Sequence, residues 1–444
     1  MIFKTDYKLE NFIINTSWEN LPDNVKNRMK GCFIDLLGAL IAGSISRQFK
    51  SGLRLAKIVG KNGNIPAFGS NEKFDFFGAS VAMGHSSNAY DIDDGHNIIR
   101  AHPGTSFVGA ILAAAYEKNI SLKEFLTAML VAYETTIRSG AAIMDYYDYA
   151  HSSGTFGAIG VAAGVGRIYG FTKEQLNNTI SVAEFNAPLV PGIRSVEYPS
   201  MNKDGVPFGV MTGALAVLET MCGFEGNKNL LEANEYRHYL DDIGKKYEVM
   251  DLYFKPYPCC RWAHPAIDAC TKTMTENKIL PDEVEKVVIK TFKRATLLSK
   301  GEPKTADEAQ YNIAYPVAAA VVKGGFGIGE VMEDSLDDPL ILAMMKKLSF
   351  EVDELIDSKF PQKRICRTEI YTSRGTFISA DCEPRGEAHE NIGIDWLADK
   401  FRHITAPIIS GEHQEKILNL VLGDENIGMQ NFVDIANSFA SNKS

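Results

Sequence analysis

Apolar residues in the first half of the chain recur at helical spacing. From Val25 to Leu40 they fall every three or four positions, and the segment "SLKEFLTAMLVAYE", residues 121–134, repeats the pattern. This period places apolar side chains on one face of an α-helix. The alanine- and glycine-rich stretch "GAIGVAAGVGRIYG", residues 157–170, has no G-x-G-x-x-G spacing and follows no predicted strand. It therefore predicts buried helices that pack closely and not a nucleotide-binding loop.

Polar residues mark where several of these helices are expected to begin. Asp23 is a candidate N-cap for the first helix. Ser121 and Glu124 have the spacing of a capping box, and so do Thr172 and Gln175. Each of these pairs stands immediately before an apolar helical pattern, so we expect a helix to start after residues 121 and 172.

The pattern changes after about residue 250. Residues 282–298 are rich in β-branched side chains and predict a strand, and residues 364–383 predict a hairpin around Ser373, Arg374 and Gly375. Residues 309–325 between them predict a helix, and the helical pattern returns at 394–404. The chain thus predicts a mainly α fold: a large all-helical domain formed by residues 1–252 and 393–444, with a smaller α+β lid domain inserted at 253–392.

Composition narrows the class of protein. The 444 residues are 45% hydrophobic and 23% charged, which is typical of a globular protein. The net charge is −10, and the sequence contains no cluster of basic residues. This argues against sequence-independent nucleic-acid binding. The N-terminus lacks the features of a signal peptide, and no apolar run approaches the ~18 residues of a membrane span. Seven cysteines without paired spacing describe no disulfide framework. We expect a cytoplasmic protein that binds neither membrane nor nucleic acid.

Candidate chemistry gathers in "GHSSNAYDIDDGHNIIRAHPGTS", residues 84–106. This segment holds three of the nine histidines and three aspartates: His85, His96, His102, Asp91, Asp93 and Asp94. If residues 80–94 form one helix that ends at Gly95, the aspartates oppose the helix dipole, so local stability does not explain them. Thr105 or Ser106 is then expected to cap the next helix. A metal site, an acid–base site and a solvated helix end are the alternatives. No spacing matches a known metal signature, and we favour acid–base chemistry.

Three further segments carry candidate site residues. "HSSGTFGAIG" places His151 before a small-residue helix, and "YPSMNKDGVPFG" places Lys203 in a turn before another. "FKPYPCCRWAHPAIDA" holds Lys255, Arg261 and His264 within ten residues at the predicted domain boundary. An arginine here is suited to bidentate binding of a carboxylate.

Together these segments resemble the MmgE/PrpD family, which includes 2-methylcitrate dehydratase, cis-aconitate decarboxylase and iminodisuccinate epimerase. The resemblance rests on "NAYDIDDGHNIIRAHPG", "AYETTIRSG", "HSSGTFGAIGVAAG", "KPYPCCRWAHPAIDA" and "DKFRHI", and it covers nearly the whole chain. It implies a large helical domain with a smaller α/β lid domain, an active site between the two, a homodimer, and catalysis without metal or organic cofactor.

The resemblance also implies which residues form the active site. Matched motif by motif, these are Asp91, His102, His151, Lys203, His264 and Tyr315. From their charge and position we add His96, Lys255 and Arg261 as substrate-binding candidates. Gly95 and the segment "KDGVPFG" depart from the family pattern where a substrate would be held, so the sequence leaves the substrate open.

The function predicted from the sequence is that of a cofactor-independent lyase, a dehydratase or decarboxylase, acting on a small di- or tricarboxylic acid. His102 or His151, tuned by Asp91, would exchange a proton at a carbon next to a carboxylate. His264 or Tyr315 would protonate a leaving hydroxyl, while the cations bind substrate carboxylates and stabilise enolate charge. The alternatives are an epimerase or isomerase of a substituted succinate, a metal-dependent hydrolase, and a non-catalytic carboxylate-binding protein.

Overall fold

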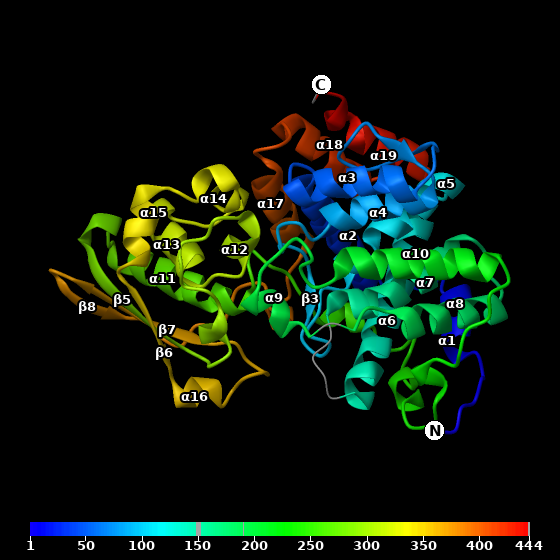
Figure 1. Ribbon diagram of the computed structural model, residues 1–444, viewed down its shortest axis with the longest axis horizontal. Coiled ribbons are helices and arrows are strands. Elements are labelled where there is room, and N and C mark those ends of the chain that lie inside the picture. Colours follow the sequence, from blue (N-terminus) through cyan, green and yellow to red (C-terminus); the bar gives the residue numbers. More distant parts are fainter. Residues whose placement is uncertain (148–151, 190, 443–444) are drawn as a thin grey trace.

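The computed structural model describes residues 1–147, 152–189 and 191–442. It is mainly α, as the periodicity predicts. Helices from both ends of the chain lie in one lobe, and a four-stranded sheet with its own helices lies beside them (Figure 1). The lobe that contains both termini is built from α1 (Lys8–Asn15), α2 (Asp23–Gly43), α3 (Arg47–Val59), α4 (Phe76–Ser86), α5 (Val108–Lys118), α6 (Leu122–Tyr146), α7 (Ser153–Ile168), α8 (Lys173–Asn186), α9 (Ile193–Glu197), α10 (Val206–Met221), α17 (Ile394–Thr405), α18 (Gly411–Leu422) and α19 (Met429–Ala436).

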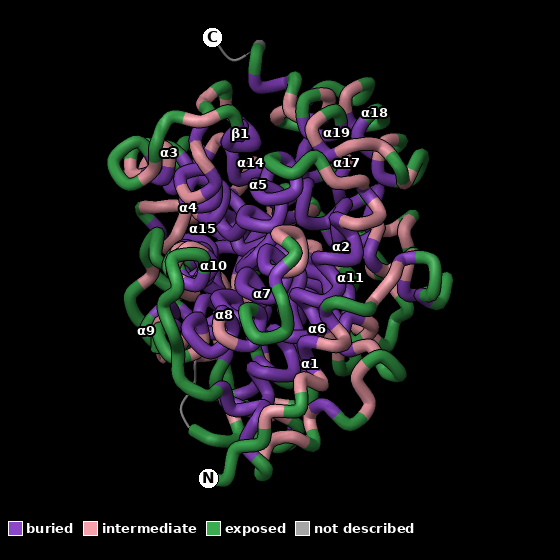
Figure 2. The backbone as a smooth tube through the Cα atoms, turned by 90° about the vertical axis from the view of Figure 1, so that its right-hand side faces the viewer, coloured by how far each residue is buried: buried purple, intermediate pink, exposed green. Residues whose placement is uncertain are grey.

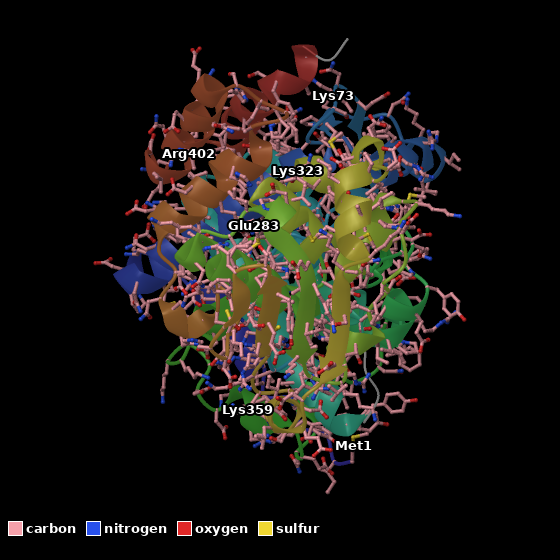
Figure 3. The ribbon with its side chains drawn as sticks, turned by 90° about the vertical axis from the view of Figure 1, so that its left-hand side faces the viewer. Met1, Lys73, Glu283, Lys323, Lys359 and Arg402 are labelled. Atoms are coloured by element: carbon pink, nitrogen blue, oxygen red, sulfur yellow. The ribbon has the colours of Figure 1, made fainter. Side chains whose placement is uncertain are left out.

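The sheet lobe has strand order β6-β5-β7-β8, with β5 parallel to β6 and antiparallel to β7. Charged side chains on this side of the molecule, such as Lys323 and Lys359, are exposed (Figure 3). Its elements are β5 (Val284–Thr291), β6 (Leu348–Val352), β7 (Cys366–Thr372), β8 (Gly375–Ile378), α11 (His264–Asn277), α12 (Ala306–Gln310), α13 (Ala314–Lys323), α14 (Ile328–Val331), α15 (Pro339–Met345) and α16 (Glu354–Asp357). The division of the chain at residues 253 and 392 stays a prediction.

Two hydrophobic cores match the two lobes. The larger runs from Leu9 to Phe254 and resumes at Leu397, and the smaller centres on residues 257–370. Figure 2 shows that α7 is almost wholly buried, and α2 is buried throughout from Gly31 to its end at Gly43. Small residues let these helices approach closely, since a Cβ on Gly209 of α10 would collide with the carbonyl oxygen of Gly154 in α7. Close packing of the glycine-rich helix is therefore confirmed.

Most predicted helix starts and strands are confirmed. Ser121 accepts a hydrogen bond from the Glu124 N–H at the start of α6, and Thr172 with Gln175 forms a complete capping box on α8. The predicted strand is β5, and the predicted hairpin is the antiparallel pair β7–β8. The segment 309–325 differs from the prediction because it contains the end of α12 and then α13, separated by a turn.

Two cap predictions are wrong. Asp23 is the first residue of α2, and Pro22 occupies the N-cap position. Neither Thr105 nor Ser106 caps α5, whose N-cap is Phe107. Both residues lie instead in a short 3-10 helix, Gly104–Ser106, and the Ser106 hydroxyl donates to the carbonyl of His102 at 2.7 Å. The Ser106 side chain therefore stabilises the turn that begins at His102.

The largest correction concerns residues 87–94, which were predicted to be helical. Helix α4 ends at Ser86, and Gly95 is not its terminator but the first residue of β3 (Gly95–His96). Strand β3 pairs with β4 (Leu252–Tyr253), which brings the end of residues 87–94, here called the aspartate loop, next to the chain that leads into the second lobe. A second short pair joins β1 (Ile65–Pro66) to β2 (Lys73–Phe74). The aspartates thus lie on a buried loop and not at a helix end.

Across the described part of the chain, no single helix combines the length and apolar composition needed to cross a membrane. Helices α2 and α3 pass that test only when taken together, and the pair is bent by 86°.

Candidate active site

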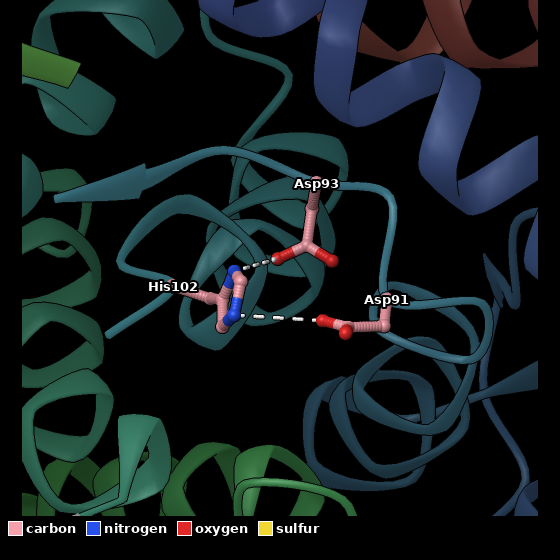
Figure 4. Close-up of side chains that lie close together, drawn as sticks. All are labelled: Asp91, Asp93 and His102. Atoms are coloured by element: carbon pink, nitrogen blue, oxygen red, sulfur yellow. Dashed lines mark ion pairs between the residues drawn. The ribbon is translucent and has the colours of Figure 1, made fainter. Parts of the chain in front are cut away.

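The candidate site is centred on His102, which has a carboxylate near each ring nitrogen (Figure 4). Its Nε2 lies 3.4 Å from Asp91 Oδ1, and its Nδ1 lies 3.3 Å from Asp93 Oδ2. All three residues are buried, with His102 the most accessible at 9% exposure. The aspartate loop and the turn at His102 and Pro103 are separated by a short connection in the sequence. In the structure they meet at the imidazole of His102.

The aspartate loop has an unusual backbone at Asp91. Its φ is +49°, in the left-handed region that few non-glycine residues adopt, although aspartate tolerates it better than most. The loop is held in place by Asn88, whose amide donates to Asp93 Oδ1 at 2.8 Å. Backbone strain of this kind persists where the surroundings enforce it, and it clusters at functional sites.

Lys255 adds a buried positive charge to the site. It lies two residues after the end of β4, is 0% exposed, and places its Nζ 2.6 Å from Asp91 Oδ1. The two carboxylates of Asp91 and Asp93 thus face two cations, Lys255 and a protonated His102. Buried charges require such pairing because each one loses its hydration.

This pairing sets the protonation of the imidazole. Burial by itself lowers the pKa of His102, but Asp93 and then Asp91 outweigh both burial and the nearby Lys255, so the pKa of His102 is raised well above its usual value. The same ion pairs act in reverse on the carboxylate, since His102 overcomes burial and lowers the pKa of Asp93. His102 is therefore an imidazolium at neutral pH, and an imidazolium is a proton donor.

Hydrogen bonds leave one nitrogen of His102 for chemistry. Nδ1 lies 2.7 Å from the carbonyl oxygen of Asp94, and because a carbonyl only accepts, Nδ1 carries a hydrogen. The backbone N–H of His102 donates to Ser153 Oγ at the start of α7 at 3.0 Å. Among the described residues, Nε2 makes no such short bond and faces Asp91 and, at 3.7 Å, Asp204. Nε2 is thus the nitrogen placed to exchange a proton with a ligand.

Asp94 has a supporting role. Its Oδ1 accepts the N–H of Gly104 at 3.0 Å, and the hydroxyl of Tyr133 in α6 donates to its other oxygen. Burial raises the pKa of Asp94 to about 7, although Tyr133 opposes this shift. The side chain thus fixes the turn after His102.

Helix α17 contributes a lysine to the same region. Lys400 Nζ lies 2.5 Å from Asp35 Oδ1 of α2 and donates to the carbonyl of Ile92 at 2.6 Å. The C-terminal segment "DKFRHI" therefore contacts the aspartate loop through this lysine. Its lysine holds the backbone between Asp91 and Asp93.

Lys203 immediately precedes Asp204, a residue that faces His102 Nε2. Its Nζ is buried in an ion pair with Asp307 at 2.7 Å and also donates to Gln310, both from α12. Lys203 has a φ of +46°, and this bend directs the next residue, Asp204, toward His102. Gln310 also donates to the carbonyl of Ala89 at 3.2 Å, so α12 contacts the aspartate loop.

The other predicted residues are placed differently. Arg261 is paired with Glu387 at 2.9 Å and donates to the carbonyl of Arg385 at 2.8 Å. His264 accepts from Arg261 through Nδ1 and donates through Nε2 to the Cys259 carbonyl, so both nitrogens are occupied and it is neutral. Burial first, and then Arg261, lower its pKa well below the usual value.

Two more candidates have no contact with His102 in the described residues. The Tyr315 hydroxyl donates to the backbone carbonyl of Glu330 at 2.7 Å. His96 is buried in β3 without a hydrogen-bond partner for either nitrogen among the described residues, and burial lowers its pKa to about 4. His151 lies outside the described residues. The structure thus brings together Asp91, His102 and Lys255, with Lys203 adjacent through Asp204, and the roles predicted for all of them stay predictions.

Sequence reasoning missed three residues of the cluster as site residues. Asp93 was noticed but not assigned, and Asp204 was overlooked beside Lys203. A sequence signal for Asp204 was present, because it precedes Gly205 at the start of a helix. Gln310 gave no signal, since only the packing of α12 against the aspartate loop reveals it.

The same geometry bears on the metal alternative. Asp91, Asp93 and His102 each offer a ligand atom within 4.8 Å of the others. However, the two carboxylates lie near opposite nitrogens of the ring, and the ammonium of Lys255 already contacts Asp91 at 2.6 Å. This arrangement is typical of a charge-balanced acid–base site and less suited to chelation of one ion by a single ring nitrogen.

Comparison with known families places the chain. The MmgE/PrpD N-terminal domain matches residues 7–241, and the MmgE/PrpD C-terminal domain matches residues 257–425. The chain belongs to the MmgE/PrpD family. The resemblance drawn from the sequence motifs is confirmed.

Curated members of the MmgE/PrpD family match along nearly their whole length. A cis-aconitate decarboxylase-like protein, oryM, of Aspergillus oryzae is 21% identical, with 94% of each chain covered. The cis-aconitate decarboxylase of Homo sapiens is 21% identical over 92% of this chain and 89% of its own. That of Aspergillus terreus is 20% identical over 92% of this chain and 91% of its own.

Proposed function

We propose that the protein is a cofactor-independent lyase that decarboxylates a small di- or tricarboxylic acid by placing a proton on a carbon next to a carboxylate. The observation that carries the proposal is the His102 imidazolium, whose Nε2 has no short hydrogen bond to a described residue while Nδ1 is held by the Asp94 carbonyl. The activity named for the relatives, cis-aconitate decarboxylase, supports the same reaction class.

The proposed step is a decarboxylation followed by protonation at carbon. The bond between a substrate carboxylate and its carbon breaks, carbon dioxide leaves, and the electron pair enters the unsaturated acid, where a neighbouring carboxylate carries it as an enolate. His102 then transfers the proton of Nε2 to carbon and becomes neutral, and a proton from water restores the imidazolium. Such general-acid help typically contributes ~10²–10⁴-fold to the rate. Lys255 and Lys203 lie in the same charge cluster, and their ion pairs with Asp91 and Asp307 would have to be shared with the developing enolate for these lysines to stabilise it.

The protonation of His102 favours decarboxylation over the other reactions of the family. A decarboxylase needs an acid after carbon dioxide has left, whereas a dehydratase or an epimerase first needs a base to remove a proton. Asp204 supports this second candidate, because it faces Nε2 of His102 at 3.7 Å and burial, as the largest cause, raises the pKa of its carboxyl. A carboxylate with a raised pKa is a stronger base.

The proposal extends to assembly and domain motion. Residues 253–392 would form a lid that closes over the site, which is supported by the contribution of Lys255 and Gln310 from that segment. A homodimer is proposed from the family resemblance, and the cytoplasmic location expected from the sequence stays a proposal. Exposed apolar side chains on α10, including Leu215 at 47% exposure, support a protein contact there.

The proposal is tested by turnover in D₂O. The purified protein is incubated with cis-aconitate, citrate, 2-methylcitrate and substituted succinates and followed by proton NMR. We expect an acid that loses carbon dioxide and gains deuterium at the carbon next to a carboxylate. Loss of water or an exchange that inverts a stereocentre would favour the second candidate, and no reaction with any of these acids would contradict the lyase proposal.

A further inference from the structure

A surface pocket lies beside the candidate site, on the side of α9 and α10. It has a volume of about 430 Å³, within the range of small-molecule sites. Its polar lining includes Arg194, Ser195, Asn202 and Lys203, and its apolar lining includes Tyr198 and Phe208. We call it the Arg194 pocket.

The Arg194 pocket adjoins the candidate site at the segment that carries Asp204. Lys203 and Gly205 line the pocket, and the residue between them reaches His102 Nε2 at 3.7 Å. The carbonyl of Asp204 accepts the N–H of Gly154 at 2.9 Å, which ties this wall to the N-terminal turn of α7. The N-termini of α7 and α10 thus meet at the boundary between pocket and site, where their partial positive charge favours an anion.

Two polar groups at this boundary have no partner among the described residues. The guanidinium of Arg194 is exposed and forms no ion pair or hydrogen bond with any described side chain. The hydroxyl of Ser152, 98% buried at the N-cap of α7, makes no hydrogen bond to a described residue. It lies 3.0 Å from the position of a Cβ on Gly205, so it faces the glycine that lines the pocket.

The charges around the pocket make Arg194 distinctive. Lys203 is neutralised by Asp307, Lys255 by Asp91, and Arg261 by Glu387. In a chain of net charge −10, an anionic group needs a local cation that is not already paired. Arg194 supplies this charge among the described residues that line the pocket.

We propose that the Arg194 pocket binds the second carboxylate of the substrate, the one remote from the carbon that His102 protonates. This inference rests on the proposed function, and it assigns the second carboxylate of that di- or tricarboxylic acid to a place in the structure. Arg194 would hold the remote carboxylate by a bidentate contact, with the Ser152 hydroxyl and the partial positive charge of the two helix starts completing the anion site.

The test uses propane-1,2,3-tricarboxylate, a saturated acid that cannot be decarboxylated in this way, and butanoate as a one-carboxylate probe. Binding to the full-length protein is measured by calorimetry for the wild type, Arg194→Gln and the matched control Arg54→Gln, an exposed arginine of α3 outside the pocket. We expect Arg194→Gln to weaken tricarboxylate binding about tenfold, the effect of one charge-assisted hydrogen bond, and to leave butanoate unchanged. Arg54→Gln should match the wild type.

The outcomes separate this inference from the proposed function. Equal tricarboxylate affinity of Arg194→Gln and Arg54→Gln, or no tricarboxylate binding by the wild type, overturns the pocket assignment even if the enzyme decarboxylates an acid. Weakened binding in Arg194→Gln together with no turnover of any acid by the wild type supports the pocket and overturns the lyase. For a substrate that is turned over, we expect Arg194→Gln to raise KM with kcat nearly unchanged, because the contact is present in both ground and transition states.

Discussion

Asp91 forms an ion pair of 2.6 Å with Lys255 while its carboxylate also faces His102 Nε2 at 3.4 Å. One carboxylate therefore joins a lysine from the start of the second lobe to the histidine of the first. Because Asp91 is among the causes that raise the pKa of His102, its charge helps to keep the imidazole protonated. The first prediction follows from this dual contact.

Asp91→Asn should lower the pKa of His102, because a neutral amide replaces a negative charge beside Nε2. The reaction that needs the imidazolium then fails at a lower pH, so the alkaline limb of the pH profile of kcat/KM moves toward acid. Asp395→Asn, an exposed aspartate of α17, is the control and should leave the profile in place. An unchanged alkaline limb in Asp91→Asn would show that Asp91 does not tune His102.

The wild type should lose stability as pH rises because of Glu184 in α8. Burial raises the pKa of this carboxyl from 4.5 to about 8, with the Leu230 N–H opposing the shift. Between about pH 4.5 and 8 the folded state holds a proton that the unfolded state has released, so the free energy of unfolding falls across that window. Glu184→Gln should flatten this slope, as measured by urea unfolding at several pH values. Glu276→Gln, at an exposed glutamate, should leave it unchanged.

Close packing of α7 and α10 should make Gly209 intolerant of substitution. A Cβ at this position collides with the Gly154 backbone, which cannot move without shifting the wall that carries Asp204. Gly209→Ala should lower the free energy of unfolding by about 1–3 kcal/mol, the usual cost of overpacking. Gly329→Ala, where nothing lies within 4 Å, is the matched control for chemical denaturation. Equal stability of the two variants would contradict tight packing between these helices.

A charge on the outer face of α10 should disrupt the proposed homodimer. Leu215→Glu places a carboxylate in the exposed apolar stripe of α10, and sedimentation at several concentrations should then report a monomer. Leu355→Glu, at a 77% exposed leucine of α16, should sediment like the wild type. A wild type that is itself monomeric at all concentrations would contradict the dimer.

The sequence predicted the parts of the fold that depend on the pattern of neighbouring residues. The capping box of α8, strand β5 and the β7–β8 hairpin all follow from local patterns. Residues 87–94 were predicted wrongly because a helical pattern continues past Ser86, whereas the pairing of β3 with a strand more than 150 residues away overrides it. Long-range pairing of two residues each leaves no mark in a local pattern.

The predicted site residues that the structure brings together are titratable side chains in the segments that carry the family motifs. Asp91, His102 and Lys255 were all named before their contacts were visible, whereas Arg261 carries the same charge yet is paired with Glu387. A sequence states which side chains are charged, but the partners of a buried charge depend on packing. The same limit explains why Gln310 was missed.

The central claim is that His102 supplies the proton, and the most direct measurement is the rate of His102→Gln. Glutamine keeps a polar group in the pocket but cannot donate a proton at neutral pH, while His389→Gln removes an exposed histidine outside the site. With the acid that the wild type turns over, we predict that His102→Gln lowers kcat by ~10²–10⁴-fold and that His389→Gln retains the wild-type rate. A His102→Gln enzyme that is correctly folded and keeps the full rate would contradict the account.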